Sequence, residues 1–411
     1  MNLEVTSETG RLKAVIVHTP GREISLVNPD IKNALLFDDI IFEDDARREH
    51  LGMIDLIKTG MPESGKVYQI TDLIRECFRE EKARHHFIAN LIETLPYENL
   101  HSIEADLYKL DEESLIQFAI EGTTPALHDF ILLPSPNLLF TRDLAAVVGK
   151  SVVISRAAKK ARIRESLLTE TVIEYHPLFS TICKNIIRIG SGDSIEGGDI
   201  LVLSDKIVLI GMSERTSFSG LMNAADQLLK KGVEHVLIVD IPKQRSSMHL
   251  DTIFTFCSEN ECVAYPPAIM ERKNNVVHLT LVNNIVCTEI RESLKSVIEE
   301  LTGREYTFIK CGGEKITNQQ REQWSDGANV FALAPGLIIG YERNINTFKA
   351  LEEQGYRIMD QFEFGDAYRD RRYEPGKDPK TAVHFHGHEL CRGRGGARCM
   401  TMPIAREQKP F

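Results

Sequence analysis

The sequence predicts an α/β fold interrupted by one all-helical segment. Short runs rich in valine and isoleucine alternate with amphipathic stretches along most of the chain, a pattern typical of α/β proteins. Residues 70–129 break this rhythm, because no convincing strand pattern occurs there. The 411 residues are 42% hydrophobic and 27% charged, which fits a soluble globular protein with a large core.

Six segments carry the strand pattern, each a short run rich in β-branched residues that is bounded by glycine, proline or charge. The predicted strands are Leu12–His18, Val152–Ser155, Ile207–Gly211, His235–Asp240, Val276–Val282 and Gly336–Tyr341. Amphipathic spacing predicts three of the intervening helices. These helices are Gly220–Lys231, Thr288–Leu301 and Asn344–Gln354.

The segment without strands has its own periodicity. Apolar residues from Ile74 to Leu95 recur at helical spacing until Pro96, and two more short helices are expected at 102–107 and 111–120. We therefore expect residues 70–129 to form a helical insertion, with 1–69 and 130–411 forming one α/β domain. The alternative is that these helices are a layer of that same domain.

The net charge indicates which binding partners to expect, and the cysteines indicate the cellular compartment. The net charge of −11 disfavours nucleic acid and anionic membranes as partners, but not a cationic small molecule. No apolar run is long enough to span a bilayer. The eight cysteines form no C-x-x-C pair, which favours a reducing cytoplasm over a disulfide framework.

The C-terminal region carries the first of four polar clusters. Cys399 lies in a glycine-rich run with Arg392, Arg394 and Arg398. Nearby cations stabilise a thiolate and lower its pKa, and the thiolate is the nucleophilic form of cysteine. Cys399 is therefore a candidate nucleophile. The alternative is a small buried hydrophobic residue beside an arginine-rich surface loop.

Two clusters contribute carboxylates. Asp143 follows Thr141-Arg142 between two apolar stretches, so it is expected to be partly buried and to need a cationic partner. That partner is either Arg142 or a bound cation. Glu196 and Asp199 flank a Gly-Gly turn, where the alternative to a binding role is an aspartate that caps a backbone N–H.

The fourth cluster combines a histidine with a carboxylate. Alternation predicts that His249 and Asp251 lie on one face of a strand, so a general base and a substrate-binding carboxylate could share a pocket. A core histidine that is satisfied by its neighbour is the competing interpretation.

Together the clusters suit one kind of electrophile. They supply a nucleophile, a proton shuttle and several carboxylates. A guanidinium is planar and permanently charged, and carboxylates match its N–H edges in bidentate geometry. Carboxylates around its plane would leave the central carbon open to a thiolate, whereas they would repel a phosphate.

A run of three histidines suggests a different chemistry. His384, His386 and His388 recur at every second position, and three imidazoles can bind zinc. No further ligand occurs at a fixed spacing, and Gly387 indicates a turn. We therefore expect no metal and no organic cofactor.

In their order along the chain, the clusters identify a family resemblance. The chain resembles the bacterial arginine deiminases of the guanidine-modifying (pentein) superfamily over nearly its whole length. The motifs are Leu-Leu-Phe-Asp-Asp at 35–39, Phe-Thr-Arg-Asp at 140–143, Glu-Gly-Gly-Asp at 196–199, Gly-Met-Ser-Glu-Arg-Thr at 211–216, Met-His-Leu-Asp-Thr at 248–252 and the closing run at 392–400. The resemblance implies a five-fold pseudo-symmetric α/β propeller with a helical insertion.

The resemblance also implies roles for individual residues. Cys399 would form a covalent amidino-enzyme, His249 would be the acid–base group, and Glu196 would orient its imidazole. Asp143 and Asp251 would clamp the guanidinium. The implied substrate-binding residues are Asn137, Phe140, Arg162, Asp199, Arg215 and Arg394. Arg162 and Arg215, with Asn137, would bind the substrate α-carboxylate, Phe140 would form an apolar wall, and Arg394 would lie on a mobile loop.

The implied reaction is the hydrolysis of L-arginine to L-citrulline and ammonia by a cytoplasmic enzyme that we expect to be a homo-oligomer. An arginine dihydrolase that continues to ornithine, or an amidinotransferase of the same fold, is the enzymatic alternative. A catalytically silent relative that binds arginine is the other. The position before the nucleophile varies in the family, and Arg398 there would either lower the Cys399 pKa further or point to solvent.

Overall fold

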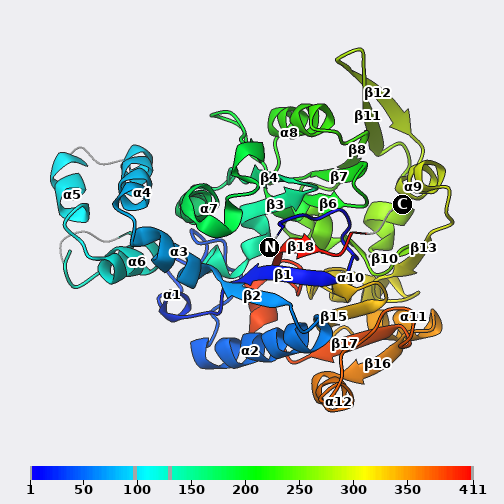
Figure 1. The fold of residues 1–411 in the computed structure, drawn as a ribbon. Coiled ribbons are helices and arrows are strands. Elements are labelled where there is room, and N and C mark those ends of the chain that lie inside the picture. The colour runs from blue at the N-terminus through cyan, green and yellow to red at the C-terminus, as the bar shows by residue number, and fades with distance from the viewer. Residues whose placement is uncertain (1, 96–99, 128–131, 409–411) are drawn as a thin grey trace.

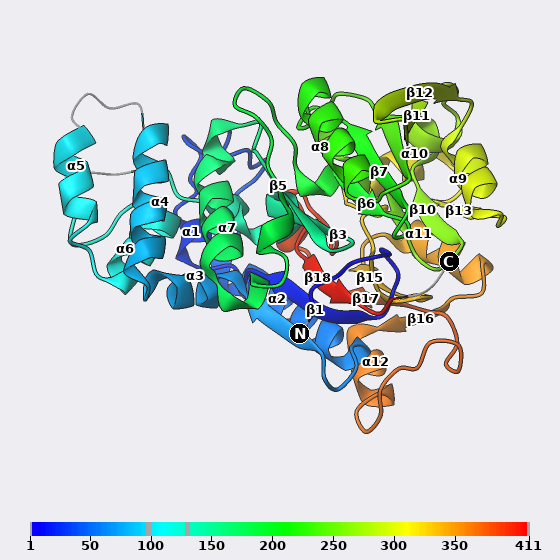
Figure 2. The same cartoon turned by 45° about the horizontal axis from the view of Figure 1, so that its top comes forward.

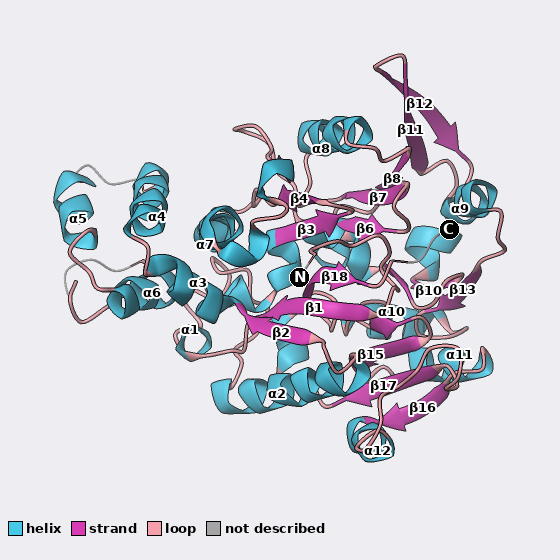
Figure 3. Ribbon diagram, in the orientation of Figure 1, coloured by secondary structure: helices cyan, strands magenta, loops and turns pink. Residues whose placement is uncertain are grey.

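Five small β-sheets form the centre of the described molecule, and helices cover them (Figures 1 and 3). The structure is a computed structural model that describes residues 2–95, 100–127 and 132–408. The fold is mixed α/β, as the alternation of strand and helix patterns predicts. No described helix is long and apolar enough to cross a membrane.

The first sheet joins distant parts of the chain. In it β1 (Leu12–Val17) pairs antiparallel with β18 (Met402–Arg406) and parallel with β2 (Lys66–Gln69). In this register Ile16 lies opposite Met402. The blue and red strands therefore lie side by side in Figures 1 and 2, and the loop that carries Cys399 is anchored on β1.

The other four sheets are formed more locally. The second consists of β3 (Ala145–Val148), β4 (Ser151–Ile154) and β5 (Ile186–Ile187). The third, in order, is β12 (Ile285–Arg291), β11 (Val276–Val282), β8 (His235–Asp240), β7 (Ile207–Met212) and β6 (Ile200–Val202). The fourth is β13 (Thr307–Lys310), β10 (Glu261–Ala264) and β9 (Phe254–Phe256). The fifth is β14 (Phe331–Ala334), β15 (Leu337–Tyr341), β17 (Thr381–Phe385) and β16 (Arg357–Asp360).

Helices pack on the outside of these sheets. They are α1 (Arg22–Ser25), α2 (Glu43–Gly60), α7 (Ile163–Tyr175), α8 (Phe218–Lys230), α9 (Leu294–Thr302), α10 (Ile316–Trp324), α11 (Ile345–Glu353) and α12 (Gln361–Ala367). Helix α8 shows the sequence logic: Ser217 accepts a hydrogen bond from the Gly220 N–H as the N-cap, and Leu221, Ala225 and Leu228 form its buried face.

All six predicted strands and the three predicted helices occur, with one clear error. Helix α9 begins at Leu294, six residues after the predicted start at Thr288. Residues up to Arg291 belong to strand β12, which pairs with β11. The hydroxyl of Ser293 caps the helix by accepting from the Ser296 N–H, so the helix begins at this cap.

The described part of residues 70–129 is helical and contains no strand. It consists of α3 (Ile70–Phe78), α4 (Glu81–Thr94), α5 (Leu100–Leu107) and α6 (Glu112–Glu121), which lie to one side of the sheets in both Figures 1 and 2. Residues 96–99 and 128–129 fall outside the described residues. The division of the chain into a main domain and an insertion stays a prediction.

Candidate active site

Four short 3₁₀ turns carry the polar clusters. They span Thr141–Leu144, Gly197–Asp199, Leu250–Thr252 and Leu390–Gly393. The second packs against both the first and the third. The predicted strand for His249 and Asp251 is therefore wrong: His249 precedes a 3₁₀ turn that contains Asp251. A turn brings these two side chains together as strand alternation would, but without a sheet face.

These turns enclose a narrow cavity. Its lining includes eight of the eleven candidate residues: Asn137, Phe140, Asp143, Arg162, Arg215, His249, Arg394 and Cys399. The rest of the lining is Leu36, Arg245, Met248 and Gly393. The cavity volume is about 10 Å³, roughly the room that one water molecule needs. A substrate as large as an amino acid would therefore require side chains to move.

His249 is held between two carboxylates. Its Nε2 lies 2.9 Å from Oε2 of Glu196, and its Nδ1 lies 3.5 Å from Oδ1 of Asp143. Burial opposes a charge on the imidazole, but Asp143, Glu196 and Asp199 outweigh it and raise the His249 pKa to about 9. For Glu196, burial is likewise outweighed by the His249 hydrogen bond and by Arg162, so its pKa falls to about 2. The resting site thus favours an imidazolium beside a carboxylate.

Arg162 is bound by three carboxylates. Its Nη1 lies 2.6 Å from Asp143 and 3.4 Å from Glu196, and its Nε lies 3.0 Å from Glu165. Asp143 therefore has Arg162 as its ion-pair partner, not the adjacent Arg142. Arg215 is freer, because its nearest carboxylate is Glu196 at 4.0 Å. In this structure Arg162 neutralises the buried acids, so its contact with a substrate carboxylate stays a prediction.

The same acids have the spacing of a possible metal site. One atom each of Asp143, Glu196 and His249 lies within 4.8 Å of the other two. However, the Arg162 guanidinium already contacts both carboxylates and supplies the positive charge there. Asp143 Oδ1 and His249 Nδ1 have no hydrogen-bond partner among the described residues, but Arg162 already balances the carboxylate charge, and we assign no metal to this group.

Asp199 binds side-chain and backbone groups next to the cavity. Its Oδ2 accepts hydrogen bonds from Ser213 and Thr216, at 2.5 and 2.6 Å, and its Oδ1 accepts from the Leu250 N–H at 2.8 Å. The side chain is fully buried and does not line the cavity. Asp199 thereby fixes the turn that follows His249, and its contact with substrate stays a prediction.

Cys399 lies at the cavity wall against Asp251. Its Sγ is 3.8 Å and 3.9 Å from the two Asp251 oxygens, and its residue is only 4% exposed. Burial, followed by Asp251, Asp143 and Asp326, raises the pKa of this thiol well above its ordinary value. The expectation that flanking arginines lower this pKa is therefore wrong for the unliganded protein.

The three neighbouring arginines each face another partner. Arg392 pairs with Asp39 and Glu389 near the surface. Arg398 is neither solvent-facing nor directed at the thiol, because it is 1% exposed and binds carboxylates behind the cavity. Of the three arginines, only Arg394 shares the cavity lining with Cys399, and it does not offset the effect of burial and of the carboxylates around the thiol.

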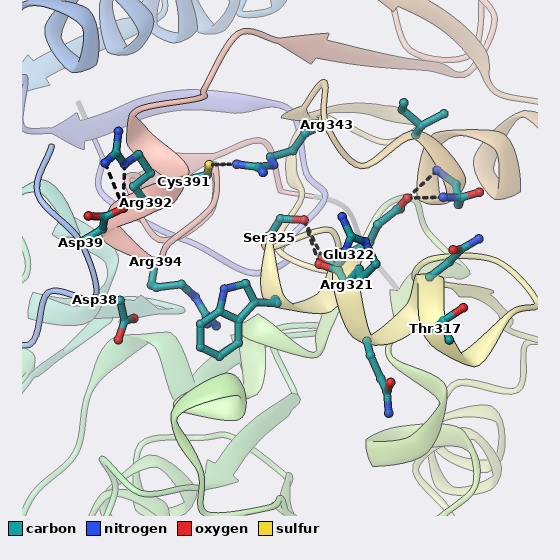
Figure 4. A pocket seen from close by; sticks show the side chains of 15 residues that line it. Asp38, Asp39, Thr317, Arg321, Glu322, Ser325, Arg343, Cys391, Arg392 and Arg394 are labelled. Atoms are coloured by element: carbon teal, nitrogen blue, oxygen red, sulfur yellow. Dashed lines mark hydrogen bonds and ion pairs between the residues drawn. The ribbon is translucent and has the colours of Figure 1, made fainter. Parts of the chain in front are cut away.

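Arg394 separates the narrow cavity from a larger one. Its guanidinium stacks on Trp324, 3.7 Å from the ring centroid, and its three nitrogen atoms have no hydrogen-bond partner. The outer cavity, whose lining Figure 4 shows, has a volume of about 960 Å³. Arg394 lines both this cavity and the narrow one. Arg394 has φ of +62°, a left-handed conformation that is uncommon outside glycine. Arg394 is the residue that the linings of the two cavities share.

Glycines permit the close packing of the turns. A Cβ on Gly198 would lie 2.8 Å from both Asp143 Oδ1 and the His249 ring. A Cβ on Gly395 would collide with the Phe140 ring. Both positions therefore require glycine because of close approach, not because of backbone dihedral angles.

Sequence reasoning missed residues that hold the nucleophile. The Asn329 side chain donates to the Asp251 carbonyl at 2.9 Å and accepts from the Cys399 N–H at 3.0 Å. Arg245 joins the lining and pairs with Asp38 at 2.9 Å. Asn329 lies far in sequence from the motifs, and Arg245 lies three residues before the motif at 248–252 but carries no chemical signature of its own, so spatial proximity reveals both.

The histidine run does not form one strand face. His384 lies in β17, whereas His386 and His388 follow the strand and both approach the Glu342 carboxylate, at 3.2 and 2.6 Å. The imidazoles of His386 and His388 are more than half exposed. The partly buried carboxylate of Glu342 thus serves as their shared partner.

Known proteins are similar to this chain in sequence and in fold. The arginine deiminase family model matches residues 33–406. An arginine deiminase of Listeria monocytogenes serotype 4b is 34% identical, with 98% of each chain covered. One of Oenococcus oeni is 33% identical, with 98% of this chain and 97% of the relative covered.

Solved structures agree on the fold. A mutant of dimethylarginine dimethylaminohydrolase from Pseudomonas aeruginosa, complexed with citrulline, has a TM-score of 0.52 at 15% identity, covering 95% of this chain and 99% of that one. The N-terminal domain of ArgZ, a cyanobacterial arginine dihydrolase bound to product, has a TM-score of 0.53 at 14% identity, covering 97% and 99%. These likenesses show a pentein fold. Together with the full-length sequence matches, they establish that this chain belongs to the arginine deiminase family.

Proposed function

We propose that this chain hydrolyses L-arginine to L-citrulline and ammonia through a covalent amidino intermediate on Cys399. The observation that carries the proposal is the lining of the narrow cavity, where a thiol, an imidazole and carboxylate-held cations meet. Family membership supports the same reaction.

The charges suggest how the thiol becomes reactive. Asp143 and Asp251 surround the thiol and disfavour its ionisation. A substrate guanidinium placed between these carboxylates would neutralise them, so the Cys399 pKa would fall when the substrate enters and the thiol proton would leave to solvent. Ionisation would thus be coupled to the binding of a cationic substrate.

The proposed reaction forms an amidino-enzyme and then hydrolyses it. The thiolate attacks the guanidinium carbon to form the S–C bond. His249, held protonated by Glu196, donates a proton as the C–N bond breaks and ammonia leaves. Neutral His249 then takes a proton from water as the water oxygen attacks the amidino carbon. The C–S bond breaks as the new hydroxyl loses its proton to the departing sulfur, which releases citrulline and restores the thiol and the protonated imidazole.

We infer complementary roles for the remaining candidates. Arg215, Arg162 and Asn137 would bind the α-carboxylate, and Phe140 would form the apolar wall. Arg394 would move from Trp324 to admit substrate. Its lack of hydrogen-bond partners in this structure supports such a second position.

A five-fold propeller is the proposed arrangement of the sheets. Strand β18 contacts β3, β1 contacts β14, and β14 contacts β9. The 3₁₀ turns at Gly197–Asp199 and Leu250–Thr252 join the remaining neighbours through contacts with β7 and β9. These contacts are those expected of five sheets around one axis, with the site at its end.

We also infer a reducing, cytoplasmic setting and a homo-oligomer. The eight cysteines are free thiols, which supports the setting. The β11–β12 hairpin projects from the molecule and exposes Val282, Ile285 and Ile290, apolar side chains that a second copy would cover (Figure 1). Ile285→Lys together with Ile290→Lys should then lower the mass measured by light scattering.

The decisive experiment incubates purified protein with L-arginine and quantifies citrulline, ornithine and ammonia. One citrulline and one ammonia per arginine are expected. Ornithine with additional ammonia would establish a dihydrolase, and amidine transfer to an added amine would establish a transferase. Binding without turnover would establish a silent relative, and each of these outcomes overturns the proposal.

Cys399→Ser tests the nucleophile, with Cys262→Ser as the matched control. Both cysteines are buried, but Cys262 lies in β10 outside the cavity. Cys399→Ser should abolish turnover and the arginine-derived mass adduct, whereas Cys262→Ser should keep activity per folded molecule. Substantial turnover in Cys399→Ser would exclude the covalent mechanism.

A further inference from the structure

A fully buried chain of charged groups lies behind the nucleophile. Arg398 donates from Nε and Nη2 to the two oxygens of Glu8, at 3.1 and 3.0 Å, and from Nη1 to Asp251 Oδ2 at 2.8 Å. Its Nη2 also donates to the Ile200 carbonyl at 2.8 Å. Every guanidinium nitrogen of Arg398 therefore has an acceptor, which fixes the orientation of this side chain.

Neither Glu8 nor Arg398 lines the narrow cavity. Glu8 instead borders a separate cavity of about 190 Å³ on the N-terminal segment. Arg398 thus approaches Asp251 from the protein interior, while Cys399 lies 3.8 Å from the same carboxylate at the cavity wall. Asp251 itself does not line the cavity, and it lies between the Arg398 guanidinium on one side and the Cys399 thiol on the other.

Asp251 has two conflicting requirements. Its side chain is fully buried, and burial disfavours a carboxylate charge. The proposed clamp on a guanidinium needs that charge. Arg398 opposes the effect of burial, but a cation held by Asp251 alone would compete with the substrate for the same oxygens.

Glu8 offers a resolution because it binds Arg398 in a bidentate manner. Two of the three nitrogen atoms of Arg398 face Glu8, and only Nη1 faces Asp251. Arg142 and Arg406 add positive charge near Glu8, which supports its ionised form. Asp251 therefore accepts from Arg398 through Oδ2 alone, and its other oxygen, Oδ1, stays available on the side of Cys399.

We propose that Glu8 and Arg398 are positioning residues for Asp251, in which Arg398 keeps the carboxylate ionised and Glu8 limits how strongly Arg398 neutralises it. This inference rests on the proposed function, because it assigns Asp251 to the guanidinium. It assigns Arg398, the residue before the nucleophile, a role in substrate binding without substrate contact.

Other charged groups also act on Asp251. They are His249 and Asp143 across the cavity, Cys399 beside it, and Asp326 and Arg142 on neighbouring segments. All of them stay in place in the variants below, so a change in the pH profile reports on the altered pair.

Arg398→Met removes the cation and keeps much of the length. Asp251 should then protonate at higher pH, so the acidic limb of kcat/KM should move up by about one pH unit or more. KM for L-arginine at neutral pH should rise roughly 10- to 150-fold, the equivalent of one lost charge-assisted hydrogen bond. Arg398→Lys keeps the charge and should leave the limb close to that of the wild type.

Glu8→Gln should not move the acidic limb of the kcat/KM profile to higher pH, in contrast to Arg398→Met. Arg398 would lose its carboxylate and turn more fully onto Asp251, so the limb should stay or move to lower pH while KM rises. Arg406→Met is the matched control: Arg406 is equally buried and donates to the Gly10 and Ala332 carbonyls, at 2.7 and 2.9 Å. Arg406 has the smallest of the cationic effects on Glu8 and has no hydrogen bond to Asp251, so this variant should lose stability with a smaller shift of the acidic limb than Arg398→Met.

Alkylation of Cys399 by iodoacetamide as a function of pH separates this inference from the proposed function, since it needs no turnover. At the alkaline pH where the thiol ionises, Asp251 should carry its charge without the Arg398 cation, so the thiolate should form at higher pH in Arg398→Met than in Arg406→Met. If wild type turns over L-arginine while neither the limb nor the alkylation profile moves in Arg398→Met, the inference is wrong. If the alkylation profile moves but wild type lacks turnover, only the proposed function fails. If Arg398→Met does not fold, an upward limb shift in Glu8→Gln, or an unaltered KM there, overturns the inference.

Discussion

His249→Gln should reveal a stability that depends on pH. The buried imidazole lies 2.9 Å from Glu196 and 3.5 Å from Asp143, so it is surrounded by negative charge. Glutamine keeps a polar N–H that can reach Glu196 but carries no charge. The variant therefore removes the ion pair while it retains much of the side-chain volume.

The direction and the size of this pH effect on stability follow from the His249 pKa. Because the folded-state pKa is raised from 6.5 to about 9, the stabilising contribution is fully present below pH 6.5 and is lost as the pH rises through 9. At about 1.36 kcal/mol per pKa unit, the full contribution is at most about 3 kcal/mol. Wild type should thus exceed His249→Gln by more at pH 6 than at pH 10.

Urea unfolding of both proteins at pH 6, 8 and 10 measures this difference. The gap between their free energies of unfolding should shrink by up to about 3 kcal/mol across the range. An NMR titration of labelled histidine should show an imidazole that stays protonated to about pH 9. A gap that is constant with pH, or an imidazole that titrates near 6.5, would refute the proposed charge state.

Three further outcomes are expected. Asp143→Asn should lower kcat/KM by orders of magnitude and, because it breaks a buried ion pair with Arg162, also cost about 3–5 kcal/mol of stability by urea unfolding; unchanged kcat/KM would remove Asp143 from the clamp. Agmatine, which lacks the α-carboxylate, should be at least about tenfold worse than L-arginine in kcat/KM because Arg215 would lose a charged partner; equal use would contradict that assignment. EDTA and His386→Ala should leave citrulline formation unchanged, and restoration by zinc after chelation would contradict the metal-free reaction.

Local sequence patterns predicted the buried strands well and the exposed hairpin poorly. Strands β7, β8 and β11 consist of apolar β-branched runs, and their predicted bounds agree with the structure to within one residue. Strand β12 is mostly exposed, so neighbouring polar residues gave it no alternating core face. Its residues from Thr288 were assigned to the following helix, whose true start is set by the Ser293 cap.

The sequence identified the residues of the site, but not which of them form ion pairs with one another. Each candidate acid or base occurs in a short motif whose local chemistry is evident. Asp143, however, pairs with Arg162 and not with adjacent Arg142, because the 3₁₀ turn directs the neighbouring side chains apart. The contact between Glu8 and Arg398 joins residues 390 positions apart, a separation at which a single sequence carries no pairing signal.

The pairing of β1 with β18 has a consequence for how the protein is made. Strand β1 emerges from the ribosome long before β18, so one of its edges stays unpaired while most of the chain is synthesised. An exposed apolar edge is a template for aggregation, and contacts of such long sequence separation form slowly. We therefore expect refolding to be slow, chaperones to raise the soluble yield, and activity to appear only after β18 docks, since the same event places Cys399 beside Asp251.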